Sequence, residues 1–179
     1  MKKNIRYNLI WLALAAIVYF GLFAAYNGGM INLFSDAIIV NIGINIILAV
    51  GLNLIIGFSG QFSLGHAGFM AIGAYAGAIL SAKNPTFGGF LSGLLVGMLV
   101  SGFVALVVGI PTLRLKGDYL AIATLGVAEI IRILLINLRG LTNGPAGIFG
   151  LPQFSNWQIV FIFAFLSILV VSNFIHSGP

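Results

Sequence analysis

The stretch GLNLIIGFSGQFSLGHAGFMAIGAYAGAIL, residues 51–80, decides the fold of this chain. Its two ends are apolar, but its centre, from Gly57 to His66, holds two serines, a glutamine, a histidine and three glycines. A single helix over residues 36–81 would be about 67 Å long, more than twice the roughly 30 Å of hydrocarbon in a bilayer. The stretch therefore predicts two membrane crossings that meet at a break or re-entrant segment near residues 57–66.

The composition indicates that the chain lies in a membrane. Of its 179 residues, 60% are apolar and 6% are charged, and the mean hydropathy is +1.15. Soluble domains carry about 25% charged residues, so this chain has too little polar surface to face water. The sequence contains no cysteine, which excludes disulfides and thiolate metal sites. The net charge of +5 comes from scattered loop residues, so no nucleic-acid partner is predicted.

Apolar runs predict about six transmembrane helices, because each crossing of the lipid bilayer needs roughly 20 mostly apolar residues. The predicted spans are Leu9–Tyr26, Asp36–Gly57, Ala67–Ala82, Gly89–Ile110, Tyr119–Leu138 and Trp157–Ile175. The predicted fold is therefore all-α: a polytopic transmembrane helix bundle that forms a single domain over residues 1–179.

The positions of the loop cations predict the orientation, since cytoplasmic loops carry an excess of Lys and Arg. A cytoplasmic N-terminus places five cations inside, against Lys83 and Arg139 outside. The five are Lys2, Lys3, Arg6, Arg114 and Lys116. We therefore expect a multi-pass protein with its N-terminus in the cytoplasm.

Two interpretations of the polar break stay open. It is either an ordinary cytoplasmic turn or a broken segment beside a solute path, where freed backbone groups can meet a polar solute. On the second interpretation, the candidate path residues are Ser59, Gln61, Ser63 and His66. His66 is equally interpreted as a hydrogen-bonded structural residue. No second histidine or carboxylate lies nearby in sequence, so no metal site is predicted.

Other polar residues lie inside the predicted spans. A row of amides, Asn41, Asn45 and Asn53, winds around the second span. These amides either bond to neighbouring helices or line a polar route, so Asn45 and Asn53 are also candidate path residues. Glu129 and Arg132 lie three residues apart on the fifth span, which places them on one face and within reach of each other. They form either a self-neutralising structural pair or part of the path.

Small residues at every fourth position predict close helix packing, because they let helix backbones approach each other in lipid. The fourth span carries such a row, and the third span carries a shorter pair. The candidate packing residues are Gly89, Gly93, Gly97, Ser101, Gly73 and Gly77.

Motifs for chemistry are missing from the sequence. It contains no G-x-x-x-x-G-K-[ST] nucleotide loop, no H-E-x-x-H motif and no Ser/His/Asp set. We therefore expect no enzymatic activity and no cofactor. If ATP powers transport, a separate subunit must hydrolyse it.

Two stretches resemble a known family. Residues 51–80, quoted above, resemble the signature of the permease subunits of bacterial branched-chain amino acid ABC importers. Residues 114–152, RLKGDYLAIATLGVAEIIRILLINLRGLTNGPAGIFGLP, are similar to the LivM-type member of that permease pair. Family members are longer, so this sequence resembles an N-terminal portion of a permease domain. The cytoplasmic loop that docks the ATPase in the family is not visible in it.

The resemblance implies a membrane-spanning permease subunit in a bacterial inner membrane. It implies a periplasmic binding protein that delivers leucine, isoleucine or valine, a second related permease subunit, and two cytoplasmic ATPase subunits. Two alternatives stay open. One is a permease of the same superfamily for urea, short amides or a sugar, and the other is a self-contained channel or ion-coupled carrier.

Overall fold

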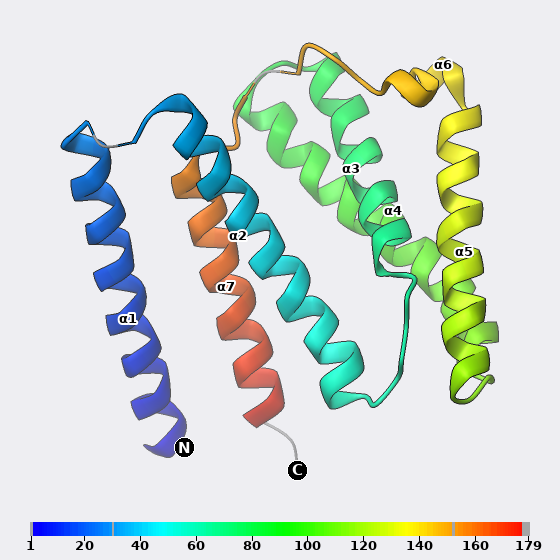
Figure 1. The fold of residues 1–179 in the computed structure, drawn as a ribbon, viewed down its shortest axis with the longest axis horizontal. Coiled ribbons are helices and arrows are strands. Elements are labelled where there is room, and N and C mark those ends of the chain that lie inside the picture. The colour runs from blue at the N-terminus through cyan, green and yellow to red at the C-terminus, as the bar shows by residue number, and fades with distance from the viewer. Residues whose placement is uncertain (1, 30, 152, 177–179) are drawn as a thin grey trace. The chain divides into compact units, whose positions relative to one another are not determined.

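The computed structural model describes residues 2–29, 31–151 and 153–176, and this part of the chain is helical without any strand. The long helices are α1 (Lys2–Asn27), α2 (Leu33–Asn53), α3 (His66–Lys83), α4 (Phe87–Thr112), α5 (Asp118–Asn137) and α7 (Trp157–His176). Short turns are η1 (Leu54–Phe58), α6 (Arg139–Thr142) and η2 (Gly144–Ala146). Figure 1 labels the helices along the chain.

The six long helices coincide with the six predicted spans, which confirms the all-α transmembrane fold. By length and apolar composition, four of the described helical segments could cross a membrane: Leu33–Phe58, Phe87–Thr112, Asp118–Asn137 and Trp157–Ile175. The described side chains of α1 add a shorter apolar helix, Trp11–Asn27. The predicted cytoplasmic cations Lys2, Lys3 and Arg6 lie on α1, but their side chains fall outside the described residues.

The chain divides into two compact units, and the boundary falls inside the predicted break. Unit 1 contains the chain up to Ser59 together with the segment from Ser155 onward, and unit 2 is Gly60–Phe154. Each unit is described by itself below. The single domain over residues 1–179 stays a prediction.

Unit 1 is built on the contact between α2 and α7, which lie side by side in Figure 1. Gly43 of α2 makes this contact close, since a Cβ at this position would lie 2.5 Å from Val160 Cγ1 of α7. Helix α1 packs on α7 through aromatic rings. The ring of Tyr19 lies 5.5 Å from that of Trp157 and 5.6 Å from that of Phe161, measured between centroids.

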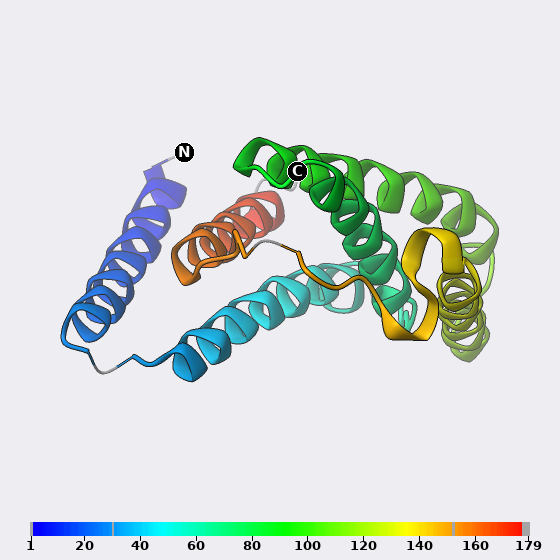
Figure 2. The same ribbon diagram turned by 90° about the horizontal axis from the view of Figure 1, so that it is seen from above.

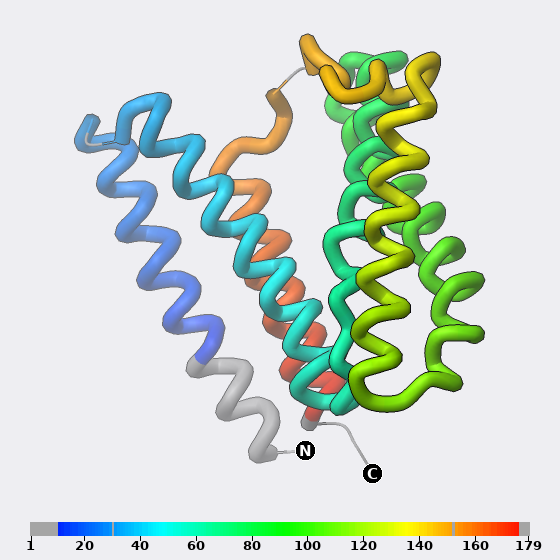
Figure 3. Tube along the Cα trace, turned by 45° about the vertical axis from the view of Figure 1, so that its right-hand side comes forward, coloured from blue at the N-terminus to red at the C-terminus, as the bar shows by residue number. Residues whose placement is uncertain are grey.

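Unit 2 is built on α3, which packs against α4 on one side and α5 on another, as Figures 2 and 3 show. The α3–α4 contact is made by glycine backbones. A Cβ at Gly97 would lie 2.5 Å from Gly73 O, and one at Gly93 would lie 2.7 Å from Gly77 O. Ser101 on α4 donates a hydrogen bond to Phe69 O on α3, at 2.8 Å. The two helices therefore approach as closely as their backbones allow.

Candidate functional site

The break begins with a wide helical turn at the end of α2. Residues Leu54–Phe58 form the π-helical turn η1, and the Ser59 N–H donates to Leu54 O at 3.2 Å. A π turn inserts one extra residue into a helix and often marks a functional position. Gly57 permits this geometry, because the Asn53 side-chain oxygen lies where a Cβ of residue 57 would be. The predicted path residues Asn53 and Ser59 therefore flank the turn on its two sides.

Residues 59–65, between η1 and α3, form no helix. Gly60 has a φ of +64°, a conformation that favours glycine. The backbone groups of residues 60–63 form no hydrogen bond with any described residue of unit 2, and neither does the side chain of Gln61. Ser63 Oγ accepts only a long bond, 3.4 Å, from the Gly65 N–H. This segment thus offers donors and acceptors that unit 2 leaves free.

One side chain on α5 holds the end of this segment. The Leu64 N–H donates to Thr124 Oγ1 at 3.0 Å, across 60 residues of sequence. The Thr124 hydroxyl in turn lies 2.9 Å from Leu120 O and 3.0 Å from Ala121 O, so its proton is directed along α5. Thr124 is only 8% exposed. It therefore fixes the position of the break relative to α5.

Two glycines bring the start of α3 against α5. A Cβ at Gly65 would lie 3.2 Å from Thr124 O, and one at Gly68 would lie 2.9 Å from Ala128 Cα. Thr124, Gly65 and Gly68, which position the break by these contacts, were not among the predicted site residues. The sequence does carry a signal for Thr124. On α5 it is the polar residue in a stripe, spaced by four, of small and apolar residues that includes Leu120 and Ala128.

His66 begins α3, and its Nε2 atom is buried without a hydrogen-bond partner among the described residues. A buried polar atom with no partner is costly and rare, so each such atom calls for an explanation. Here it lies next in sequence to the free backbone of the break. The buried Nε2 therefore marks His66 as a candidate site residue beside the break.

Two members of the amide row on α2 each donate one side-chain hydrogen bond along their own helix. Asn41 Nδ2 donates to Ala37 O at 3.0 Å, and Asn45 Nδ2 donates to Asn41 O at 2.8 Å. Both bonds run along α2 to the carbonyl four residues earlier, so each uses one of the two N–H groups of its amide within the helix. Asn45 and Asn53 lie in unit 1, whereas Gln61, Ser63 and His66 lie in unit 2.

Glu129 and Arg132 form a two-point ion pair on α5. Arg132 Nη2 lies 2.7 Å from Glu129 Oε1, and Arg132 Nε lies 3.1 Å from Oε1 and 2.9 Å from Oε2. The Arg132 side chain is 65% exposed and that of Glu129 is 51% exposed. The pair is neutral as a whole, but it lies on the outside of unit 2 rather than among its helices.

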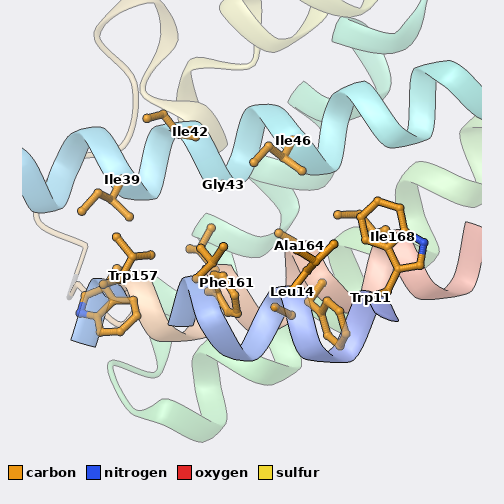
Figure 4. Close-up of a pocket in the computed structure, with 15 residues that line it drawn as sticks. Trp11, Leu14, Ile39, Ile42, Gly43, Ile46, Trp157, Phe161, Ala164 and Ile168 are labelled. Carbon is orange, nitrogen blue, oxygen red and sulfur yellow. The ribbon is translucent and has the colours of Figure 1, made fainter. Parts of the chain in front are cut away.

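Unit 1 contains an apolar cavity of about 270 Å³ between α1, α2 and α7. Figure 4 shows it between Ile42 and Ile46 of α2, Leu14 of α1, and Phe161 and Ala164 of α7. Its only polar side-chain atoms are the indole nitrogens of two tryptophans. It suits hydrocarbon and offers nothing for the charged groups of an amino acid. Among the described residues, no group of three or more His, Asp and Glu residues could hold a metal ion.

Comparison with known proteins explains the combination of apolar spans and a polar break. Residues 34–175 match the family described as the branched-chain amino acid transport system permease component. The chain belongs to this family. Membership makes it a multi-pass membrane protein of a transport system. The spans α2 to α5 and most of α7 lie inside the matched range, and so do all eight predicted path residues.

Two relatives of this permease chain carry a more specific name. The high-affinity branched-chain amino acid transport system permease protein LivM of Salmonella typhimurium is 50% identical over 86 residues. The protein of the same name from Escherichia coli is 49% identical over 86 residues. Each match covers 48% of this chain and 20% of the relative, so the shared segment spans about a fifth of the relatives' length. No solved structure matches the chain.

Proposed function

We propose that this chain is part of a permease subunit of an ATP-powered importer for branched-chain amino acids. The single observation that supports this most strongly is the 50% identity to LivM over 86 residues, within a family match over residues 34–175. On this proposal, the chain works in a bacterial inner membrane with its N-terminus in the cytoplasm. A periplasmic binding protein delivers leucine, isoleucine or valine, and a second permease subunit and two cytoplasmic ATPase subunits complete the transporter.

The chemistry of the break supports a role in the solute path. A branched-chain amino acid carries an ammonium group, a carboxylate and an apolar side chain. The carbonyls of residues 60–63, which form no hydrogen bond with a described residue of unit 2, can accept from the ammonium group. In the first turn of α3, Gly68 and Phe69 donate to Gly65 O, which leaves the N–H groups of His66 and Ala67 without a partner among the described residues of unit 2, and the positive end of the helix dipole favours a carboxylate there. Phe62, which is exposed in this segment, offers an apolar surface.

The geometry also supports different roles for two parts of unit 2, the α3–α4 contact and the break. The glycine contact between α3 and α4 is rigid, while the break is held by one hydrogen bond from Leu64 to Thr124. Alternating access requires a segment that can change its backbone conformation without unfolding the helices beside it. Gly57 and Gly60 supply that freedom on either side of Ser59.

The experiment that tests the proposal is uptake by the complete transporter in proteoliposomes. We expect labelled leucine to accumulate only when the binding protein is outside and ATP is available to the ATPase subunits. Uptake of urea without leucine would replace the substrate and keep the architecture. Leucine flux through the permease in the absence of ATPase subunits would instead indicate a channel or an ion-coupled carrier.

A further inference from the structure

The ion pair of Glu129 and Arg132 lies at hydrocarbon depth on α5. At about 1.5 Å per residue, Glu129 lies roughly 17 Å from the start of α5 and Arg132 roughly 8 Å from its end. Helical side chains lean toward the N-terminus, and Arg132 follows this rule by reaching back to Glu129. Its guanidinium therefore points toward the middle of the span and not toward the nearer membrane surface.

The pair is neutral, but its hydrogen bonding is incomplete. A guanidinium has five N–H donors, and a carboxylate offers about four acceptor positions. The bonds to Glu129 use the Nε–H and one Nη2–H, which leaves three donors of Arg132 without a partner among the described residues. They occupy three of the four acceptor positions of Glu129, which leaves one. The pair as a whole therefore has more donors than acceptors to offer.

This part of α5 is uncovered within unit 2. Three of the four buried residues of α5, Leu120, Thr124 and Ile131, lie on a different side of the helix, and the fourth, Ala121, lies about three turns from Arg132 along the axis. The ion pair is more than half exposed, and its neighbours on the same face, Ile122 and Leu125, are exposed apolar residues. Ionisable groups within a membrane span face protein or a watery cavity, because hydrocarbon cannot satisfy their donors.

We propose that this face of α5, formed by Ile122, Leu125, Glu129 and Arg132, binds a different membrane subunit of the transporter through oxygen acceptors that this subunit presents. The proposal rests on the proposed function, which requires such a subunit. A second copy of this chain fits poorly, since it would bring three more free donors and only one more free acceptor position. The apolar residues beside the pair favour protein over an open water channel.

The test places the photo-crosslinker p-benzoylphenylalanine at Leu125 in the complete purified transporter. Leu134 is the matched control, because it lies on the same helix, on the side opposite to the ion pair, and is 55% exposed against 54% for Leu125. We expect illumination to join residue 125 to a peptide of a different membrane subunit, identified by mass spectrometry, that contains Ser, Thr, Asn, Gln, Asp or Glu. The control should give at least several-fold less of this adduct.

Four outcomes would overturn the proposal. They are an adduct with lipid alone, an adduct with a second copy of the chain, an adduct within the same polypeptide, and an equal yield of the subunit adduct from residue 134. A second measurement uses the double variant Glu129→Leu/Arg132→Leu, which removes both charges and suits lipid. We expect about tenfold less of the other permease subunit to co-purify, because hydrogen bonds to a charged group are lost. Unchanged co-purification at equal membrane abundance would also overturn it.

The outcomes separate this surface from the transport function. If residue 125 reaches only lipid while ATP-dependent leucine uptake is normal, the surface is wrong and the function stands. If residue 125 joins the other subunit but leucine is not carried, the surface stands and the substrate is wrong.

Discussion

The substitution Thr124→Val tests whether one hydroxyl group holds the break in place. Valine keeps the size and branching of threonine but removes Oγ1, which accepts the Leu64 N–H at 3.0 Å. The loss of this bond leaves the amide of Leu64 without a partner. Such a change costs about 1–2 kcal/mol, which corresponds to a roughly 5- to 30-fold fall in the ratio of anchored to detached break.

Hydrogen–deuterium exchange of the purified transporter measures this ratio directly. We expect the Leu64 amide to exchange roughly 5 to 30 times faster in Thr124→Val than in the unsubstituted protein. The amides of Gln61 and Phe62 form no hydrogen bond within unit 2, so their fast exchange in both proteins is an internal reference. If the detached break binds solute poorly, the KM for leucine uptake should rise by a similar factor.

Thr124→Ser is the matched control, because serine keeps the hydroxyl and loses only a methyl group. We expect it to restore slow exchange at Leu64 and a normal KM. Equal exchange at Leu64 in Thr124→Val and the unsubstituted protein would refute the reasoning. So would a Thr124→Ser protein as impaired as Thr124→Val, since the methyl group rather than the hydroxyl would then matter.

Three further experiments test the packing of α4, the orientation in the membrane and the role of His66. Gly97→Ala should lower the melting temperature of the purified protein, because overpacking reduces the free energy of unfolding by about 1–3 kcal/mol. Gly102→Ala on the same helix is the control: its added methyl group would meet nothing within 4 Å, so it should have little effect. Cysteine at Lys116 should react with an impermeant maleimide from the cytoplasmic side only, and cysteine at Lys83 from the opposite side; the reverse pattern would invert the topology. His66→Phe should reduce leucine uptake. It should leave the melting temperature unchanged, because Nε2 has no hydrogen-bond partner to lose among the described residues. Unaltered uptake would show that His66 is not part of the path.

The sequence predicted the helices well because their signals are local. A run of apolar residues long enough to cross a bilayer needs no knowledge of the rest of the fold, and each of the six runs became a helix. The polar interruption was equally local, and it separates α2 from α3 where Ser59, Gln61 and Ser63 predict a break. The i,i+3 spacing of Glu129 and Arg132 likewise predicted that their side chains could meet.

The remaining features depend on contacts between distant segments. The bond from Leu64 to Thr124 joins residues 60 apart, and no periodic pattern specifies which helix receives a broken segment. The exposure of the Glu129–Arg132 pair on unit 2 is likewise not readable from its spacing, because it depends on which side of α5 packs against α3. The π turn at Leu54–Phe58 was also beyond prediction, since it reflects one extra residue accommodated beside Gly57.

The close glycine contact between α3 and α4 limits how these two helices can move relative to each other. Where two helices meet through side chains, those side chains can change rotamer and let one helix slide along the other. Gly73, Gly77, Gly93 and Gly97 have no side chains to rearrange, and the carbonyl of each helix already touches the backbone of the other. A rotation of α4 by about 100° would bring Leu94 and Met98, which follow Gly93 and Gly97 in sequence, into a contact that has no room for a side chain. We therefore expect helices α3 and α4 to move together, as one rigid unit, in any change of conformation.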